Sequence, residues 1–271
     1  MRSIILPDGR GSTQPGDDIA KQIAIVNQKG GVGKTTTAVN FAAALALAGH
    51  RTLLVDLDPQ GNATTGLGID KTGLTPTVYH VLVTGEPADK AIRDTALPDL
   101  KLLPSDIDLV GAEIELVGLD RREHRLRAAL AGISASYEYV VIDCPPSLGL
   151  LTINALVAAD RVMVPLQCEF FALEGLTQLL KTVKLVKERL NPPLQVAGIV
   201  LTMFDGRTSL ALQIRDEVQQ YFPGEIYDTV IPRNVRLTEA PSHGKPVMLH
   251  DLKSQGAVAY LELTREVLQD E

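Results

Sequence analysis

Short apolar runs alternate along the chain with longer stretches in which apolar residues recur at helical spacing. Strands are predicted over residues 23–26, 51–57, 100–103, 139–142, 161–165 and 196–201. Helices are predicted over residues 35–48, 107–117, 121–130, 173–190, 210–221 and 256–269, the first of them stopping at Gly49. Strands that are apolar throughout and alternate with helices indicate a parallel sheet that is covered on both faces. The pattern therefore predicts an α/β fold, a doubly wound and mostly parallel sheet with helices on both faces.

The first 21 residues differ from the rest of the chain. Residues 1–21 place glycine and proline among Ser, Thr, Gln and Asp without a visible period, which is typical of a mobile tail. From residue 22 onward the sequence has neither an internal repeat nor a linker. We therefore expect a disordered tail over residues 1–21 and one domain over residues 22–271.

No run of apolar residues is long enough to predict a membrane span. The longest uninterrupted run, Phe41–Ala48, has eight residues, whereas a spanning helix needs about 20. The N-terminal residues lack both an apolar core and a basic amphipathic pattern, so we expect no cleaved signal. Two cysteines are too few for a disulfide framework or a four-thiolate metal site. These features predict a cytoplasmic protein.

The net charge limits the ways in which the chain can contact nucleic acid. The sequence has 26 basic and 33 acidic residues, which gives a net charge of −7. A basic surface that attracts nucleic acid as a whole is therefore not expected. Any contact with DNA must come from a local patch of cations.

A glycine-rich segment gives the strongest indication of chemistry. It reads KGGVGKTT, and it follows a predicted strand and opens a predicted helix, which is the context of a phosphate-binding loop. The usual loop begins with a glycine six residues before its lysine, but this position is Gln28, so the loop is a variant. Its candidate nucleotide-binding residues are Lys29, Gly30, Gly31, Val32, Gly33, Lys34, Thr35 and Thr36.

The residue types in this loop suit a bound nucleotide better than an incidental glycine-rich turn. Glycines let the backbone curl so that several N–H groups point at phosphate oxygens, and the following helix adds its dipole. Lys34 can reach the β- and γ-phosphates, and the Thr35 hydroxyl can bind Mg²⁺. We therefore expect ATP and Mg²⁺ as cofactors. Lys29, at the mouth of the loop, is either a solvated lysine or one that reaches a phosphate held by another subunit.

Carboxylates follow two of the predicted strands. Asp56 and Asp58 end one strand, and Asp143 ends another. Ligands of open parallel sheets bind at the carboxyl ends of the strands, so the three acids should lie near the nucleotide. An apolar run that ends in Asp is the Walker B pattern, whose acid holds Mg²⁺ directly or through water. The expected metal ligands are Thr35, Asp56 and Asp143, although a strand-end Asp can instead cap a helix.

Asp58 is the candidate for activating water. It opens a Pro-Gln-Gly-Asn loop, which we expect to be mobile. A carboxylate beside the γ-phosphate can orient or deprotonate a water molecule. Pro145, Pro146 and Gly149 predict a stiff, hinged turn after Asp143, and such a turn could sense whether the γ-phosphate is present.

Five segments together resemble the ParA/Soj family of chromosome- and plasmid-partitioning ATPases. In chain order they are KGGVGKTT, DLDPQGNATTG, VVIDCPPSLGLLTINAL, LTMFDGRT and VIPRNVRLTEAPSHGKPV. The resemblance extends over about residues 22–269, and it is specific because the motifs occur together. KGGVGKTT alone would mark only the wider class with a variant, or deviant, Walker A loop.

The resemblance implies a catalytic cycle that the spacing of residues does not show. Members of the family form dimers that sandwich two ATP molecules, and the lysine that matches Lys29 reaches the partner's nucleotide. The acid that matches Asp58 supports hydrolysis, so the implied catalytic residues are Asp58, Lys29 and Lys34. The ATP-bound dimer binds double-stranded DNA without sequence preference, which implies association with the nucleoid. A ParB-type centromere-binding protein stimulates hydrolysis and releases the dimer.

The resemblance also suggests contacts for DNA and adenine. By position, Arg207 and Arg236 match arginines that contact DNA, and Pro232 and Asn234 match the loop beside adenine. From the sequence alone, both arginines could equally be solvated surface charges. Further basic residues recur on predicted helices and are better explained as solvated faces, namely Lys181, Lys184, Lys187, Arg121, Arg122, Arg125 and Arg127.

Three other functions deserve comparison with a partitioning ATPase. A MinD-like, membrane-associated ATPase needs a C-terminal amphipathic helix with a basic face, but this chain ends in the acidic sequence YLELTREVLQDE. An electron-transfer ATPase like the nitrogenase iron protein needs cluster-binding cysteines, and Cys144 and Cys168 do not match its pattern. A nucleotide-switched scaffold with little turnover is disfavoured by the intact Lys34, Asp58 and Asp143.

Overall fold

The computed structural model describes residues 20–270, so most of the expected tail lies outside the described residues. The first strand begins at Lys21, one residue before the expected start of the domain, and Ala20 is already buried. The strand begins this early because the Lys21 amide donates a hydrogen bond to the carbonyl of Glu138, 2.9 Å away.

The described residues form one sheet of seven strands in the order β3-β4-β2-β5-β1-β6-β7. The strands are β1 (Lys21–Ile25), β2 (Thr52–Asp56), β3 (Arg93–Asp94), β4 (Leu100–Leu103), β5 (Tyr139–Asp143), β6 (Arg161–Gln167) and β7 (Gln195–Thr202). Every neighbouring pair is parallel except β3 with β4, which is antiparallel. The predicted doubly wound, mostly parallel fold is confirmed.

Helices connect the strands and cover both faces of the sheet. The α-helices are α1 (Lys34–Leu47), α2 (Asn62–Gly66), α3 (Val78–Val83), α4 (Ala88–Ala91), α5 (Leu109–Glu115), α6 (Arg125–Ala131), α7 (Leu150–Ala158), α8 (Ala172–Arg189), α9 (Ser209–Tyr221), α10 (Val235–Glu239), α11 (Val247–His250) and α12 (Gln255–Gln269). Four 3₁₀ turns are also present among the described residues: η1 (Leu116–Gly118), η2 (Arg122–His124), η3 (Ser134–Ser136) and η4 (Ala240–His243).

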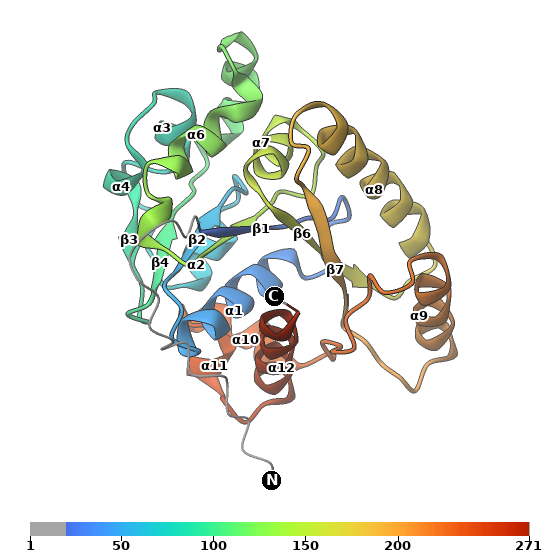
Figure 1. Cartoon of the computed structure of the whole chain (residues 1–271). Coiled ribbons are helices and arrows are strands. Elements are labelled where there is room, and N and C mark those ends of the chain that lie inside the picture. Colours follow the sequence, from blue (N-terminus) through green and yellow to red (C-terminus); the bar gives the residue numbers. More distant parts are fainter. Residues whose placement is uncertain (1–19, 271) are drawn as a thin grey trace.

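The two faces of the sheet have separate apolar cores. Figure 1 shows α1, α10, α11 and α12 on one side of the sheet and α3, α6, α7 and α8 on the other. Buried residues of α1 and α12 form one core with one face of the strands, and buried residues of α3 to α9 form the second core with the opposite face. Because both faces are covered, the central strands are apolar throughout, as the sequence pattern predicted.

The elements that the sequence did not predict are short or lack a polar face. Helices α2, α3, α4, α10 and α11 have four to six residues each, which is too short to show a 3.6-residue period. Helix α7 reads LLTINALVA and is buried almost all round, so no alternation of polar and apolar residues marks it. The edge strand β3 has only two residues.

A close contact between two glycines joins the C-terminal segment to the loop after β2. Gly244, at the end of η4, has φ of 63° and faces Gly68, whose φ is 81°. A Cβ added at Gly244 would lie 2.6 Å from the Cα of Gly68. Two backbones can approach this closely only when neither residue has a side chain. The contact therefore holds η4 against the segment that follows α2.

Gly244→Ala should lower the free energy of unfolding by about 3 kcal/mol, because the new methyl group overlaps backbone and a left-handed conformation is strained. Gly73→Ala is the matched control. Gly73 also has a positive φ, of 66°, but nothing lies within 4 Å of an added Cβ, so it should lose only about 1 kcal/mol. Urea denaturation measures both values. Equal losses in the two variants would contradict the close contact.

Candidate functional site

The glycine-rich loop joins the end of β1 to the start of α1. Gly31 and Gly33 adopt positive φ values of 76° and 89°, which glycine tolerates without strain. Gly33 is the N-cap of α1, and no side chain caps this helix. The first N–H groups of α1 therefore lack a side-chain partner, and helix N-termini of this kind bind anions.

Two side chains from neighbouring strands fix the shape of this loop. The Thr202 hydroxyl at the end of β7 donates a buried hydrogen bond to the carbonyl of Val32, at 2.7 Å. Asn27 donates from its side chain to the carbonyl of Pro165 at 2.7 Å and accepts from the Lys29 amide at 3.0 Å. The loop is thus held on both sides before any ligand arrives.

Lys34 is a buried cation at the first position of α1. Its ammonium donates a hydrogen bond to the carbonyl of Lys29 at 2.9 Å, which turns the side chain back over the loop. Burial lowers the pKa of Lys34, and the nearby Asp143, Cys144 and Asp58 oppose this shift. The lysine therefore lies where a phosphate cradled by the loop would meet it.

Asp143 is fully buried at the end of β5, and neither carboxylate oxygen has a hydrogen-bond partner among the described residues. Burial raises the pKa of Asp143 well above its usual value, and the nearby Asp56 raises it further. Thr35 and Lys34 lie close enough to oppose the shift. A buried carboxylate without a partner is costly unless a cation completes it. This donor set fits Mg²⁺, which prefers oxygen ligands.

Asp56 lies beside Asp143 on the neighbouring strand but has different partners. The two residues are in register between β2 and β5. One oxygen of Asp56 accepts hydrogen bonds from the amide and the hydroxyl of Thr64, at 2.8 and 2.7 Å. Burial raises the pKa of Asp56 to about 6, although its hydrogen bonds lower it. Asp56 therefore anchors the first turn of α2, as the helix-capping alternative anticipated, and is less available to a metal than Asp143.

Asp58 sits in a tight turn. It is buried, and its side chain accepts a hydrogen bond from the Gln60 amide at 2.9 Å. Its own amide donates to Asp56 at 3.3 Å, and its carbonyl accepts from the Gly61 amide at 2.9 Å. The sequence led us to expect a mobile residue, whereas the structure gives Asp58 fixed partners close to Lys34 and Asp143.

Any metal at this site would have to share its coordination with the nucleotide. Among residues 20–270, no three His, Cys, Asp or Glu side chains converge as a ready metal cage. Mg²⁺ usually keeps several waters and binds through one or two protein groups together with substrate phosphates. Asp143 and the Thr35 hydroxyl could supply those protein groups.

A pocket of about 200 Å³ lies next to the glycine-rich loop. It is lined by Gly31, Gly33 and Thr36 on one side and by residues 231–234 on the other. Pro232 and Asn234, which the resemblance matches to an adenine-side loop, therefore line a pocket beside the glycine-rich loop. The Asn234 side-chain oxygen accepts from the Arg236 amide at 3.0 Å and caps α10, which leaves its NH₂ group to contact a base.

Lys29 pairs with a carboxylate that lies outside the glycine-rich loop. Its ammonium lies 2.6 Å from an oxygen of Glu169, which follows β6. The two side chains are 43% and 36% exposed. An ion pair this exposed contributes at most about 1 kcal/mol, so another anion can compete for Lys29.

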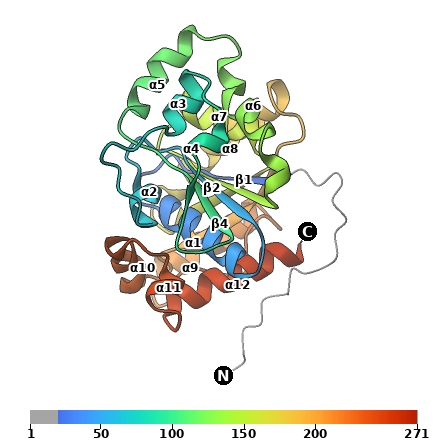
Figure 2. The ribbon, with the colours of Figure 1, turned by 90° about the vertical axis from the view of Figure 1, so that its left-hand side faces the viewer.

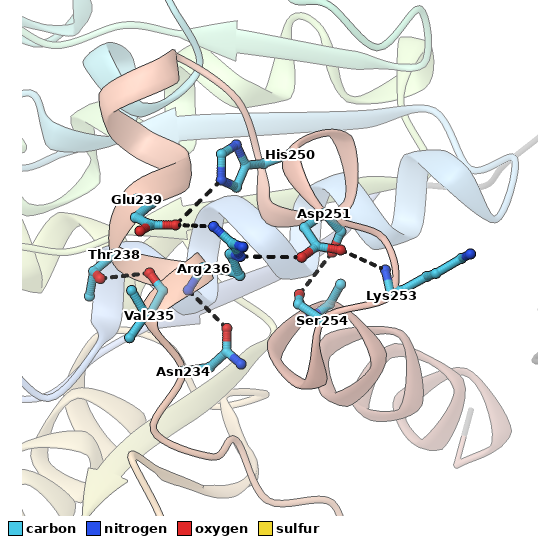
Figure 3. A network of polar contacts seen from close by, with 10 residues as sticks. Asn234, Val235, Arg236, Thr238, Glu239, His250, Asp251, Lys253 and Ser254 are labelled. Atoms are coloured by element: carbon cyan, nitrogen blue, oxygen red, sulfur yellow. Dashed lines mark hydrogen bonds and ion pairs between the residues drawn. The ribbon is translucent and has the colours of Figure 1, made fainter.

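Both candidate DNA-contacting arginines also have acidic partners. Arg207 makes a two-point contact with Asp205, at 2.8 and 2.7 Å, yet its side chain is 90% exposed. Figure 3 shows Arg236 between Glu239 and Asp251, at 2.7 and 3.3 Å. DNA phosphates would have to replace these carboxylates.

The other basic residues divide into two kinds. Lys181, Lys184 and Lys187 are exposed along α8, as expected for a solvated face. Arg125 instead donates to the carbonyl of Leu82 at 2.8 Å and has a structural role. No motif in the sequence marks Thr64, Thr202, Glu169 or Asp251 as part of the site. Each acts through a contact between segments distant in the chain, which no local motif reveals.

The fold and the glycine-rich loop together define a P-loop ATPase. A protein-family model described as an AAA domain matches residues 20–196. The chain is 57% identical over 249 residues to the sporulation initiation inhibitor protein Soj of Bacillus subtilis, covering 92% of this chain and 98% of that protein. It is 55% identical over 251 residues to the chromosome partitioning protein ParA of Myxococcus xanthus, covering 93% and 89%.

A solved structure agrees with this assignment. Cobyrinic acid a,c-diamide synthase from Mycobacterium smegmatis, with bound ADP and magnesium, matches with a TM-score of 0.82 and 40% sequence identity. The match covers 92% of this chain and 94% of the solved chain. With these relatives, the chain belongs to the ParA/Soj family of chromosome-partitioning ATPases. Within the described part of the chain, no helix is both long enough and apolar enough to span a membrane.

Thr202→Val should loosen the nucleotide loop, because it removes the hydroxyl that holds the Val32 carbonyl. We expect a loss of about 1 kcal/mol in the free energy of unfolding and an ADP affinity about fivefold weaker. Thr177→Val is the matched control, since that exposed hydroxyl only bonds a carbonyl of its own helix. Calorimetric titration with ADP compares the two. Unchanged affinity in Thr202→Val would show that the hydroxyl does not shape the site.

Proposed function

We propose that this chain is an ATP-dependent DNA-partitioning ATPase. ATP with Mg²⁺ drives formation of a homodimer that sandwiches two nucleotides and binds double-stranded DNA without sequence preference. A ParB-type centromere-binding protein then stimulates hydrolysis and releases the dimer from the nucleoid. The observation that carries the proposal is the pairing of an uncapped helix N-terminus and Lys34 with the unpartnered carboxylate of Asp143.

Each residue of the site then has a defined role. The loop amides and Lys34 bind the β- and γ-phosphates, while Thr35 and Asp143 hold Mg²⁺. The bound metal neutralises phosphate charge. Asp56 positions the turn that carries Asp58, through its hydrogen bonds to Thr64 and to the Asp58 amide. Asp58 orients the attacking water.

Dimer formation gives Lys29 a new partner. In the single chain its ammonium is neutralised by Glu169 on the surface. Two triphosphates that face each other in a partly dry interface would repel, and like charges there cost several kcal/mol. We infer that Lys29 leaves Glu169 for the nucleotide of the partner subunit. This exchange favours assembly only when ATP is present.

The C-terminal helix favours a DNA partner over a membrane. A MinD-like anchor needs an apolar face that is free to enter the bilayer interface. Helix α12 instead buries Ala257, Leu261, Leu263 and Val267 in the core that it shares with α1. The apolar face is therefore already occupied by the fold, and we do not favour the membrane-associated alternative.

Asp58→Ala should leave ATP binding within about twofold of the wild type and reduce hydrolysis by at least about a hundredfold, because water loses its orienting carboxylate. ATP should then hold the variant as a dimer, since binding assembles the sandwich and only hydrolysis opens it. Phosphate release and light scattering with ATP measure the two effects. Asp89→Ala, at an exposed position on α4, is the control. A variant that hydrolyses normally or stays monomeric would contradict the proposal.

Arg207→Glu and Arg236→Glu should each abolish DNA binding while ATP-driven dimerisation persists. For each phosphate that a protein neutralises, log affinity falls by about 0.9 when log salt concentration rises by one unit. Two arginines per subunit therefore predict, for the dimer, a slope of about −3 to −4. Each reversal should make this slope shallower. Filter binding of unrelated duplexes across a salt series, with ATP, with ADP and without nucleotide, measures this.

Arg51→Glu is the matched control for these reversals. Arg51 is an exposed arginine that is also paired with an acid, Glu138, but it lies just before the amino end of β2. It should bind DNA like the wild type. If both reversals also bind normally, the DNA site lies elsewhere, and the lysines on the exposed face of α8 would be tested next.

A further inference from the structure

Helix α5 presents a stripe of large apolar side chains to solvent. Ile107, Val110, Ile114 and Val117, hereafter the α5 stripe, are between 53% and 78% exposed. They are spaced by three, four and three residues. Val110 and Ile114 lie on α5, Ile107 lies in the turn before it, and Val117 lies in its 3₁₀ extension η1. Figure 2 shows α5 on the outside of the molecule, above α3.

The α5 stripe is not needed to fix the helix to the protein. Leu109, Ala112 and Leu116 are fully buried and pack the opposite side of the helix into the core. The segment is therefore apolar on two sides, and only one of them is used by the fold. Apolar residues gathered on an exposed face mark an interaction surface more often than a scattered few do.

Charge identifies the kind of partner that this surface fits. Residues 102–120 contain no lysine or arginine but five acids, which are Asp106, Asp108, Glu113, Glu115 and Asp120. Arg122 lies at one end of this segment, where it donates to the Val117 carbonyl at 3.1 Å. The excess of acids still disfavours nucleic acid and anionic lipid. It also opposes pairing with the same face of a second copy, because that would bring two acidic sets together. A positively charged amphipathic segment is complementary to it.

The α5 stripe adjoins the residues proposed to carry out hydrolysis. A pocket of about 520 Å³ is lined by Ile107, Asp106 and Asp108 and by Pro59 and Gln60, which directly follow Asp58. Lys71 also lines it, with its ammonium held by the Gln60 carbonyl at 2.6 Å, so the two acids are left to pair with a cation from a partner. A side chain that enters this pocket would touch the turn that holds Asp58.

Two further contacts join α5 to the carboxylates. The Ser105 amide donates to the Thr64 hydroxyl at 3.0 Å, and that hydroxyl donates to Asp56. Glu113 on α5 lies against Gly149, in the turn after Asp143, where an added Cβ would collide with it. The segment that carries the stripe therefore contacts both Thr64, which holds Asp56, and the turn after Asp143.

We propose that the α5 stripe is the docking surface for a basic amphipathic helix of the protein partner that stimulates hydrolysis. The inference rests on the proposed function, because it places the ParB-type partner on a defined surface. The apolar side of the partner helix covers the stripe, and a cationic side chain enters the pocket beside Asp106 and Asp108. Docking there acts on the Asp58 turn without contacting the nucleotide.

The test uses the ParB-type protein from the same organism and the full chain. In Ile114→Ser/Val117→Ser, affinity for this protein and its stimulation of ATP hydrolysis should each fall about tenfold or more, as for loss of a central apolar anchor. Asp108→Lys should weaken binding and reduce its dependence on salt. Basal hydrolysis and DNA binding should not change. Leu47→Ser, at an exposed apolar position at the end of α1 on the other face of the sheet, and Asp89→Lys are the controls.

Each possible outcome decides a separate question. Full stimulation of the stripe variant would overturn the docking surface and leave the proposed function intact. Absence of stimulation in the wild type would contradict the proposed function and the docking inference with it. Loss of the ATP-bound dimer in the stripe variant would assign the surface to a second copy. Tighter partner binding after deletion of residues 1–19 would assign it to the chain's own terminus. Either assignment would overturn the proposal.

Discussion

A buried imbalance of charge organises this molecule. Lys34 is the only buried lysine or arginine among the described residues, and Asp56, Asp58 and Asp143 are buried near it. Asp56 and Asp58 accept hydrogen bonds that hold them, whereas within residues 20–270 neither carboxylate oxygen of Asp143 has a hydrogen-bond partner. Burial and neighbouring acids raise the pKa of Asp143 because they disfavour its charged form. A bound cation would stabilise that charged form. The parallel sheet creates this arrangement, because the register of β2 and β5 brings Asp56 and Asp143 side by side.

The candidate cations on the surface differ from Asp143, because each of them already has an acidic partner. Lys29 pairs with Glu169, Arg207 with Asp205, and Arg236 with Glu239 and Asp251. Exposed ion pairs are individually weak, so a phosphate of nucleotide or DNA can take the place of the acid. In the proposed cycle, assembly and DNA binding are therefore exchanges of one anion for another.

The sequence predicted the sheet and the nucleotide loop well because both depend on local order. Apolar runs identified six of the strands, and the glycine spacing located the loop at the start of α1. It could not show that Asp56 holds Thr64 or that Thr202 holds the loop, because those partners meet only in the folded chain. The same reason hid the acidic partners of Arg236. Helix α7 was missed since a helix that is buried all round has no polar side to mark it.

We propose that the buried carboxylate of Asp143 receives the cation that accompanies ATP. The most direct test of this claim is ATP affinity measured by calorimetry with and without Mg²⁺, in the wild type and in Asp143→Asn, with thermal denaturation to verify folding. The wild type should bind ATP at least about tenfold more tightly with Mg²⁺, because the metal joins carboxylate to phosphate. Asp143→Asn should lose most of that gain while keeping the affinity measured without metal. An undiminished Mg²⁺ effect in the variant would contradict the account.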